Sequence, residues 1–277
     1  RGLGDVYKRQ GQKNILVQDG VGTHGVPVEP YPAILVSDIE NVYSTGYALR
    51  KGNYYGSSMA GNGDNYTACP VYRSVEALLN YIEAYYELNG VLDGTATAYW
   101  KRIRERHTGM DTDFMKTVNA TDISKEAQGD WGAYTAGAML TDPIKYNIRR
   151  ERRCELIAED FRHMDLQRWR SYDQLITNRY HVEGFHIWGT PMQQWYDQKQ
   201  LAATISPASR SEYMRPFEAK LNDAFEGLSW SMAHYLRPIP IYQMMLTSPD
   251  GQSVANSPMY QNPYWPTEPT RLRCISY

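Results

Sequence analysis

The chain has 277 residues, which is enough to bury a sizeable hydrophobic core in one or two domains. Its 29 Lys and Arg against 31 Asp and Glu give a net charge of −2, which excludes a general electrostatic attraction to nucleic acid or anionic lipid. Tyrosine is the compositional outlier, with 23 Tyr and 7 Trp against only 5 Phe. Rings that carry a polar edge mildly favour a recognition surface.

The start of the chain carries little periodicity. The first ten residues, RGLGDVYKRQ, resemble a translated sequencing adapter, and we expect residues 1–10 to be non-native. Residues 11–70 are rich in Gly, Asn, Tyr and Pro, which predicts loops with short strands, one of them at residues 34–36. A long exposed loop is expected at residues 52–64.

Helical periodicity begins near residue 71 and predicts two antiparallel helices. The apolar stripe of the first helix consists of Val71, Val75, Leu78, Ile82 and Tyr86. Polar residues, among them Asn80 and Glu83, lie opposite that stripe. Gly90 predicts the stop of this helix, Asp93 can cap the next one, and the second helix is expected to end near Gly109. Two such helices form an αα-hairpin, as in tetratricopeptide-type repeats.

The stretch from Asp142 to Trp169 predicts two more helices, at about 143–159 and up to about 177. Asp142 and Pro143 are typical of an N-cap and a first helical position. Helical spacing places two isoleucines and three carboxylates on one stripe: Ile144, Ile148, Glu151, Glu155 and Glu159. Carboxylates four residues apart repel one another unless cations intervene, and buried charges need partners. We therefore favour a partly buried arginine–carboxylate network over a solvated charged face.

These residues resemble the helical signature of the SusD/RagB family of outer-membrane nutrient-binding lipoproteins. The matching positions are Glu151, Arg152, Arg153, Glu155, Glu159, Arg162, Asp165, Arg168 and Trp169. The helical pair at 71–106 and the closing stretches YLRPIP and SPMYQNPYW resemble the family in the same order. Asp160 stands where the family usually has glycine, so we expect a left-handed or turn conformation there.

The resemblance implies a mainly α fold of tetratricopeptide-like helical hairpins with long loop-rich insertions and a few short strands. Residues 11–277 would be the C-terminal part of a single domain whose N-terminal half, with its export signal and lipid-bearing cysteine, is missing. The implied function is a non-catalytic receptor on the surface of the outer membrane. It would capture oligosaccharides and deliver them to a SusC-like TonB-dependent transporter, without a cofactor or a metal.

Aromatic residues in the expected loops are the candidates for ligand binding, because flat rings stack against sugar faces. We nominate Tyr54, Tyr55, Trp131 and Tyr134, with Trp188 and Trp195 as runners-up. Each of these could instead pack its loop onto the helical body.

Several alternatives remain open. A peptide receptor of the same family is one, and an intracellular helical scaffold that binds protein partners is another. Glu159, Asp160 and Asp165 could be drawn as a glycosidase pair, but the neighbouring arginines lower carboxylate pKa values, which is the wrong direction for a general acid. We therefore expect no catalytic residues. Asn62, Asp64 and Asn65 are oxygen donors that could hold calcium.

Overall fold

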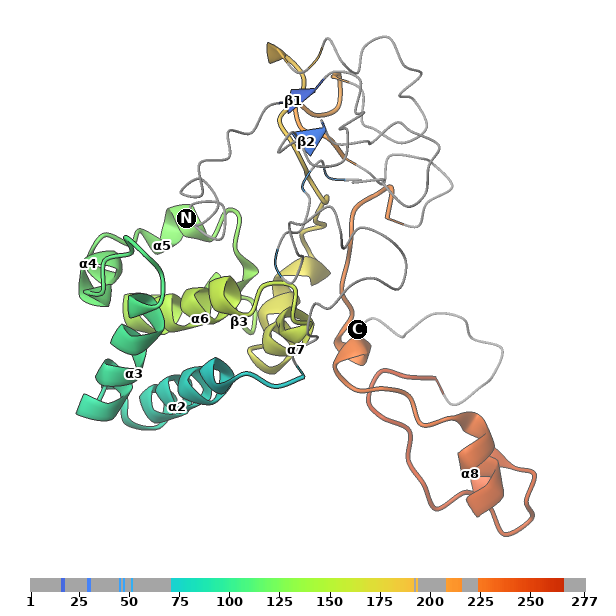
Figure 1. Ribbon diagram of the computed structural model, residues 1–277. Coiled ribbons are helices and arrows are strands. Elements are labelled where there is room, and N and C mark those ends of the chain that lie inside the picture. The colour runs from blue at the N-terminus through green and yellow to red at the C-terminus, as the bar shows by residue number, and fades with distance from the viewer. Residues whose placement is uncertain are drawn as a thin grey trace, which may run out of the picture.

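The computed structural model describes the helical body and the segments that follow it (Figure 1). The residues described are 45, 47, 51, 71–191, 193, 208–215 and 224–266, together with the backbone of two short strands before them. The α-helices of this part are α2 (Ser74–Asn89), α3 (Gly94–Glu105), α4 (Phe114–Asn119), α5 (Ile123–Glu126), α6 (Pro143–Glu155), α7 (Phe161–Arg168) and α8 (Ile241–Thr247). Short 3-10 turns are η3 (Trp131–Ala133), η4 (Ser171–Ile176), η7 (Met232–Tyr235) and η8 (Val254–Asn256). The predicted mainly α fold is confirmed.

The end of α2 and the start of α3, on either side of the hairpin turn, lie where the sequence predicts them. Gly90 adopts the left-handed conformation (φ 70°), and its N–H donates to the carbonyl of Tyr86 at 2.8 Å, which ends α2. The carboxylate of Asp93 accepts the N–H of Ala96 at 2.6 Å and so caps α3. The second helix ends at Glu105, four residues before the expected stop.

The main hydrophobic core lies between α2, α3, α4 and α6. Trp100 of α3 stacks on Phe114 of α4 with ring centroids 4.2 Å apart, and Ile148 of α6 closes the same cluster. The predicted stripe of α2 needs correction at its start, because Val71 is exposed and precedes the helix. Leu79 is fully buried, whereas Leu78 is only partly buried.

The predicted helices at 143–159 and up to 177 are both shorter in the structure. The helix α6 begins at Pro143, with the Asp142 carboxylate accepting two backbone N–H groups, and it ends at Glu155. Ala158 (φ 61°) and Asp160 (φ 64°) then adopt left-handed conformations, which confirms the turn expected at Asp160. Arg170 is also left-handed (φ 53°), so α7 stops at Arg168 and the chain continues as η4.

The strands are short. β3 (Tyr134–Thr135) pairs antiparallel with β4 (Ala138–Met139), and the two residues between them both have positive φ, which suits a tight hairpin. β1 (Leu16–Val17) pairs in parallel with β2 (Glu29–Pro30). The strand expected at 34–36 lies outside the described residues.

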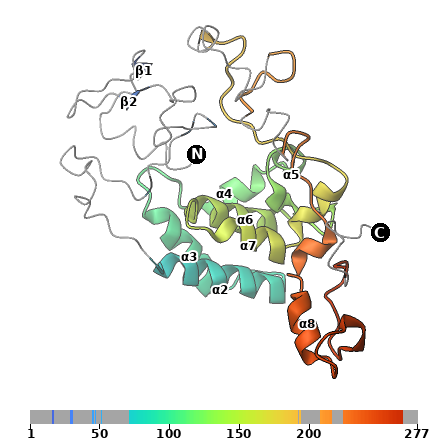
Figure 2. The same ribbon diagram turned by 90° about the vertical axis from the view of Figure 1, so that its right-hand side faces the viewer.

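Figures 1 and 2 agree that α2, α3, α4, α6 and α7 lie together, whereas α8 lies to one side at the end of the C-terminal segment. Within the described part of the chain, no helix combines the length and the apolar character that crossing a membrane requires.

Candidate functional site

The charges of the signature form a buried network. Glu151 accepts both Nε and Nη2 of Arg104 on α3, at 3.1 and 2.8 Å. Arg152 donates its Nε to Asp165 at 2.7 Å and its Nη1 to Asn80 of α2 at 2.6 Å. Glu151, Arg152 and Asp165 are all buried. The predicted arginine–carboxylate network is therefore confirmed, and it ties α6 to both helices of the hairpin.

Glu83 of α2 is a member of this network that the sequence pattern placed on the solvated face. It is only 6% exposed and accepts Nη1 and Nη2 of Arg168 at 2.5 and 2.7 Å and the indole N–H of Trp169 at 2.6 Å. Burial works to raise the pKa of Glu83, but the bonds from Arg168 and Trp169 outweigh it and hold that pKa below its usual value.

A second group of cations gathers where α6 ends. Glu155 accepts Arg73 and Arg106 at 2.6 and 2.7 Å, and Glu159 pairs with Arg73 and Lys51. The ammonium of Lys51 also donates to the carbonyl of Glu155 at 2.8 Å, so it caps the carbonyl end of the helix. Glu159 thus joins this cluster from beyond the helix, not from the helical stripe that the spacing predicted.

A further buried carboxylate, Asp130, lies just before the turn η3. It is 3% exposed and accepts the N–H of Gly132 at 2.9 Å, which caps that turn. Arg162 and Arg153 donate to its two oxygens at 2.6 and 2.8 Å. Burial works to raise the pKa of Asp130, but the attraction of the two arginines outweighs it, and the pKa lies below its usual value.

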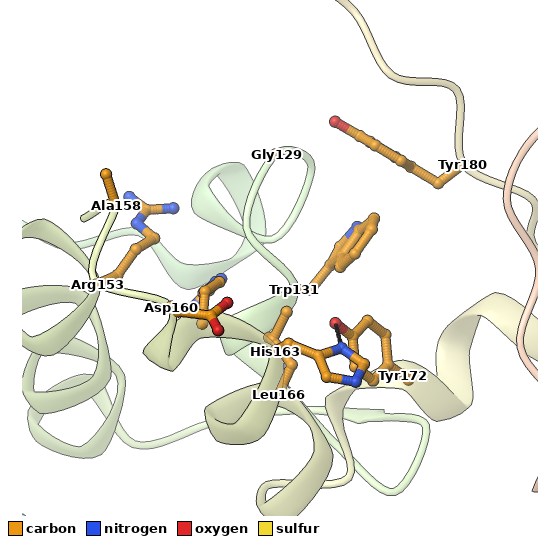
Figure 3. A pocket seen from close by; sticks show the side chains of 10 residues that line it. Gly129, Trp131, Arg153, Ala158, Asp160, His163, Leu166, Tyr172 and Tyr180 are labelled. Carbon is orange, nitrogen blue, oxygen red and sulfur yellow. Dashed lines mark hydrogen bonds between the residues drawn. The ribbon is translucent and has the colours of Figure 1, made fainter. Parts of the chain in front are cut away.

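An open pocket of about 710 Å³ lies beside these arginines, between the turn η3 and the start of α7 (Figure 3). Its walls combine aromatic rings with polar groups, which come from η3, α6, the break after α6, α7, η4 and the segment at Tyr180. The lining residues are Gly129, Trp131, Arg153, Ala158, Asp160, Arg162, His163, Leu166, Tyr172 and Tyr180.

Aromatic rings form one wall of the pocket. Trp131 meets Tyr180 edge to face, with centroids 4.6 Å apart, and it meets Tyr172 at 5.7 Å (Figure 3). Tyr172 stacks in turn on Trp230 at 4.4 Å, and its hydroxyl lies 3.0 Å from Nδ1 of His163. This cluster supports Trp131 from behind while leaving it partly exposed.

Tyr180 reaches the pocket from a segment that the helical signature does not include. Its backbone pairs with that of Leu228 through two hydrogen bonds of 3.0 and 2.7 Å. Gly227 (φ 90°) allows this close approach, because a Cβ there would lie 3.2 Å from the carbonyl oxygen of Tyr180. Burial raises the pKa of both Tyr172 and Tyr180, so their hydroxyls stay protonated at neutral pH.

Opposite the rings, the pocket presents charged groups. Arg153 and Arg162 are partly exposed and share the Asp130 carboxylate, while Asp160 is exposed. The two arginines and the two carboxylates cancel in formal charge. The wall can therefore donate and accept hydrogen bonds without a strong net field.

Of the four residues nominated for ligand binding, the structure places one at the pocket and one in a core cluster. Trp131 lines the pocket. Tyr134 packs against the small core cluster around Tyr146, and its hydroxyl donates to the carbonyl of Ala127 at 3.4 Å. Tyr54 and Tyr55 lie outside the described residues.

The remaining candidates add little to this pocket. Trp188 is not among its lining residues, and Trp195 and the oxygen donors at 62–65 lie outside the described part of the chain. Sequence reasoning missed His163, Tyr172 and Tyr180. His163 and Tyr172 lie on α7 and η4, inside the stretch for which the sequence predicts only a helix, and Tyr180 has no local signal at all.

The carboxylates drawn as a glycosidase pair have separate structural surroundings. Glu159 pairs with Lys51 and Arg73, and Asp165 pairs with Arg152 and Arg168. Only Asp160 of the three lines the pocket. Among the described residues, no three His, Cys, Asp or Glu side chains are grouped so that they could hold a metal ion.

The comparisons with known proteins address the family directly. The profile of the SusD family matches residues 28–265, which is most of the chain and includes the hairpin, the charged signature and the closing stretches. No curated protein and no solved structure matches the chain. Members of this family are in general nutrient-binding, non-catalytic proteins associated with the outer membrane. The extent of the match shows that the chain belongs to the SusD family.

Proposed function

We propose that this protein captures oligosaccharides in the pocket beside η3 and delivers them to a SusC-like TonB-dependent transporter at the outer membrane. Membership of the SusD family supports a nutrient-binding surface receptor in general and speaks against an intracellular scaffold. The observation that carries the finer proposal is the partly exposed indole of Trp131 in a pocket with hydrogen-bonding groups on the facing wall.

The size and the walls of the pocket suit a sugar. Its volume of about 710 Å³ falls within the range of small-molecule sites. Sugar rings offer an apolar face of C–H groups that stacks on an indole and a rim of hydroxyls that needs both donors and acceptors. Arg153 and Arg162 supply donors, Asp160 supplies acceptors, and Tyr180 supplies a second ring.

The charge balance favours a neutral ligand over a charged peptide. A site for charged peptide groups needs a fixed charge of opposite sign that is not already neutralised. Here the two arginine charges are balanced in number by two carboxylates: Asp130, which the arginines share, and Asp160, which lines the same pocket. A neutral oligosaccharide makes use of their remaining N–H groups without that requirement.

The test is calorimetric titration of the protein with a panel of neutral oligosaccharides and, in parallel, with a peptide pool. We expect Trp131→Ala to weaken oligosaccharide binding about tenfold, because a stacked aromatic contact contributes roughly 1.5 kcal/mol. The matched control is Tyr260→Ala, which removes an aromatic side chain that is 91% exposed and lies outside the pocket. That variant should bind like the wild type.

Two results would contradict the proposal. Binding of peptides and not of oligosaccharides would leave a nutrient receptor but reject its sugar specificity. Equal affinities of the wild type and Trp131→Ala would show that the ligand binds elsewhere than in this pocket. The delivery step is tested separately, by asking whether the protein isolated from solubilised outer membranes brings a TonB-dependent transporter with it.

A further inference from the structure

We propose that Asp130 is the positioning residue of this pocket: one buried carboxylate fixes the turn that carries Trp131 and the two arginines of the facing wall. The inference rests on the proposed function for the identity of the ligand, but the arrangement itself is visible without a ligand. Asp130 does not line the pocket, so it acts only through the residues that it holds.

Both oxygens of Asp130 accept hydrogen bonds. Oδ1 accepts the backbone N–H of Gly132 at 2.9 Å and Nη2 of Arg162 at 2.6 Å. Oδ2 lies 2.8 Å from Nη1 of Arg153 and 3.1 Å from the hydroxyl of Tyr146. Each oxygen thus has an arginine donor and Oδ1 has a backbone donor as well, whereas the single proton of the Tyr146 hydroxyl is shared with Glu126, whose Oε2 lies 3.0 Å from it.

Three of these contacts lead directly to the pocket. Arg153 and Arg162 are lining residues, and they come from different helices, α6 and α7. The bond to Gly132 closes the turn around Trp131, which stands between the acceptor residue and the donor residue. The carboxylate thus sets the position of both the aromatic wall and the charged wall.

Gly132 leaves room for the contact between Asp130 and Arg162. A Cβ at this position would lie 3.1 Å from Oδ1 of Asp130 and 3.4 Å from Nη1 of Arg162. The absence of a side chain therefore lets the guanidinium approach the turn. A side chain at this position would require the carboxylate of Asp130 or the guanidinium of Arg162 to move away by a few tenths of an ångström.

The chemistry of the cluster requires a carboxylate and not merely a polar group. An asparagine at position 130 would have the same shape, but in either orientation its NH₂ group would face an arginine, which can only donate. It would also leave two partly buried guanidinium groups without their counter-charge. We expect the pocket to rearrange in such a variant even if the helices persist.

The experiment compares Asp130→Asn with Glu151→Gln. Glu151 is also a buried carboxylate; it pairs with Arg104 and lies outside the pocket. The readout is the ¹⁵N-indole NMR signal of Trp131, identified by its loss in Trp131→Phe, together with oligosaccharide affinity. We expect Asp130→Asn to shift the Trp131 signal and to weaken binding about tenfold, whereas Glu151→Gln lowers stability but leaves both unchanged.

A second variant keeps the test decisive if Asp130→Asn does not fold. Gly132→Ala crowds the same contacts while retaining the carboxylate, and we expect it to shift the Trp131 signal in the same way. An unmoved Trp131 signal, or one that moves equally in Glu151→Gln, would overturn the positioning role. If the wild type binds no oligosaccharide, the proposed function fails, yet the NMR comparison still decides whether Asp130 positions Trp131.

Discussion

Glu83 illustrates what one buried carboxylate does in this protein. It lies on α2, yet its partners Arg168 and Trp169 come more than 80 residues later in the chain. The guanidinium groups of Arg149 and Arg168 lie over the indole of Trp169, 4.6 and 4.8 Å from its centroid. Glu83, Arg168 and Trp169 thus join α2 to the end of α7 within the helical body.

Replacing Glu83 should be costly for stability. In Glu83→Gln the charge that compensates Arg168 is lost, and we expect the free energy of unfolding to fall by about 2 kcal/mol, since Arg168 itself is partly exposed. Denaturant titration measures the change. The control is Glu105→Gln at the exposed end of α3, which should change stability little. Equal losses in the two variants would contradict the assigned role of Glu83.

At the scale of elements, the break between α6 and α7 brings the charged clusters together. Ala158 and Asp160 adopt left-handed conformations there, and the start of α7 then brings Arg162 to Asp130 and Asp165 to Arg152. A left-handed residue with a Cβ is strained, and a β-branched side chain is strained most.

This strain predicts an order of stability at position 160. Asp160→Val should lower the free energy of unfolding by about 1–2 kcal/mol, because valine tolerates positive φ poorly. Asp160→Gly should be at least as stable as the wild type. Thermal or denaturant unfolding of the three proteins checks this order, and a valine variant as stable as the glycine variant would show that the turn is not strained.

The elements that sequence predicts well are those whose signals are local. Gly90 and Asp93 mark the ends of the hairpin helices through their own backbone and side-chain bonds. The end of α6 was misjudged, because Glu159 continues the helical spacing although it is held by Lys51 and Arg73 from distant segments. Tyr180 was missed for the same reason, since only its pairing with Leu228 brings it to the pocket.

At the scale of the whole molecule, buried carboxylates join elements that are far apart in sequence, and this makes the fold sensitive to acid. Glu83, Asp130 and Glu155 are buried, and each has a pKa below its usual value. Burial opposes the shift in each case, and the paired arginines outweigh it, together with a hydrogen bond from Trp169 at Glu83 and one with His107 at Glu155.

The sign of the pH dependence follows from these shifts. A carboxylate whose folded pKa is lower than its unfolded pKa contributes stability above the unfolded value, near pH 4, and loses that contribution as pH falls through the folded value. We therefore expect the denaturant midpoint to be steady near neutral pH and to fall steeply below about pH 4. A midpoint that is unchanged down to pH 3 would contradict the contribution of these ion pairs to the stability of the fold.

The most direct test of the central claim is a crystal structure of the protein with a bound neutral oligosaccharide. The account predicts a sugar ring stacked against Trp131, with hydroxyls within hydrogen-bond distance of Arg153, Arg162 or Asp160. Sugar bound elsewhere on the protein, with the pocket beside η3 empty, would contradict it.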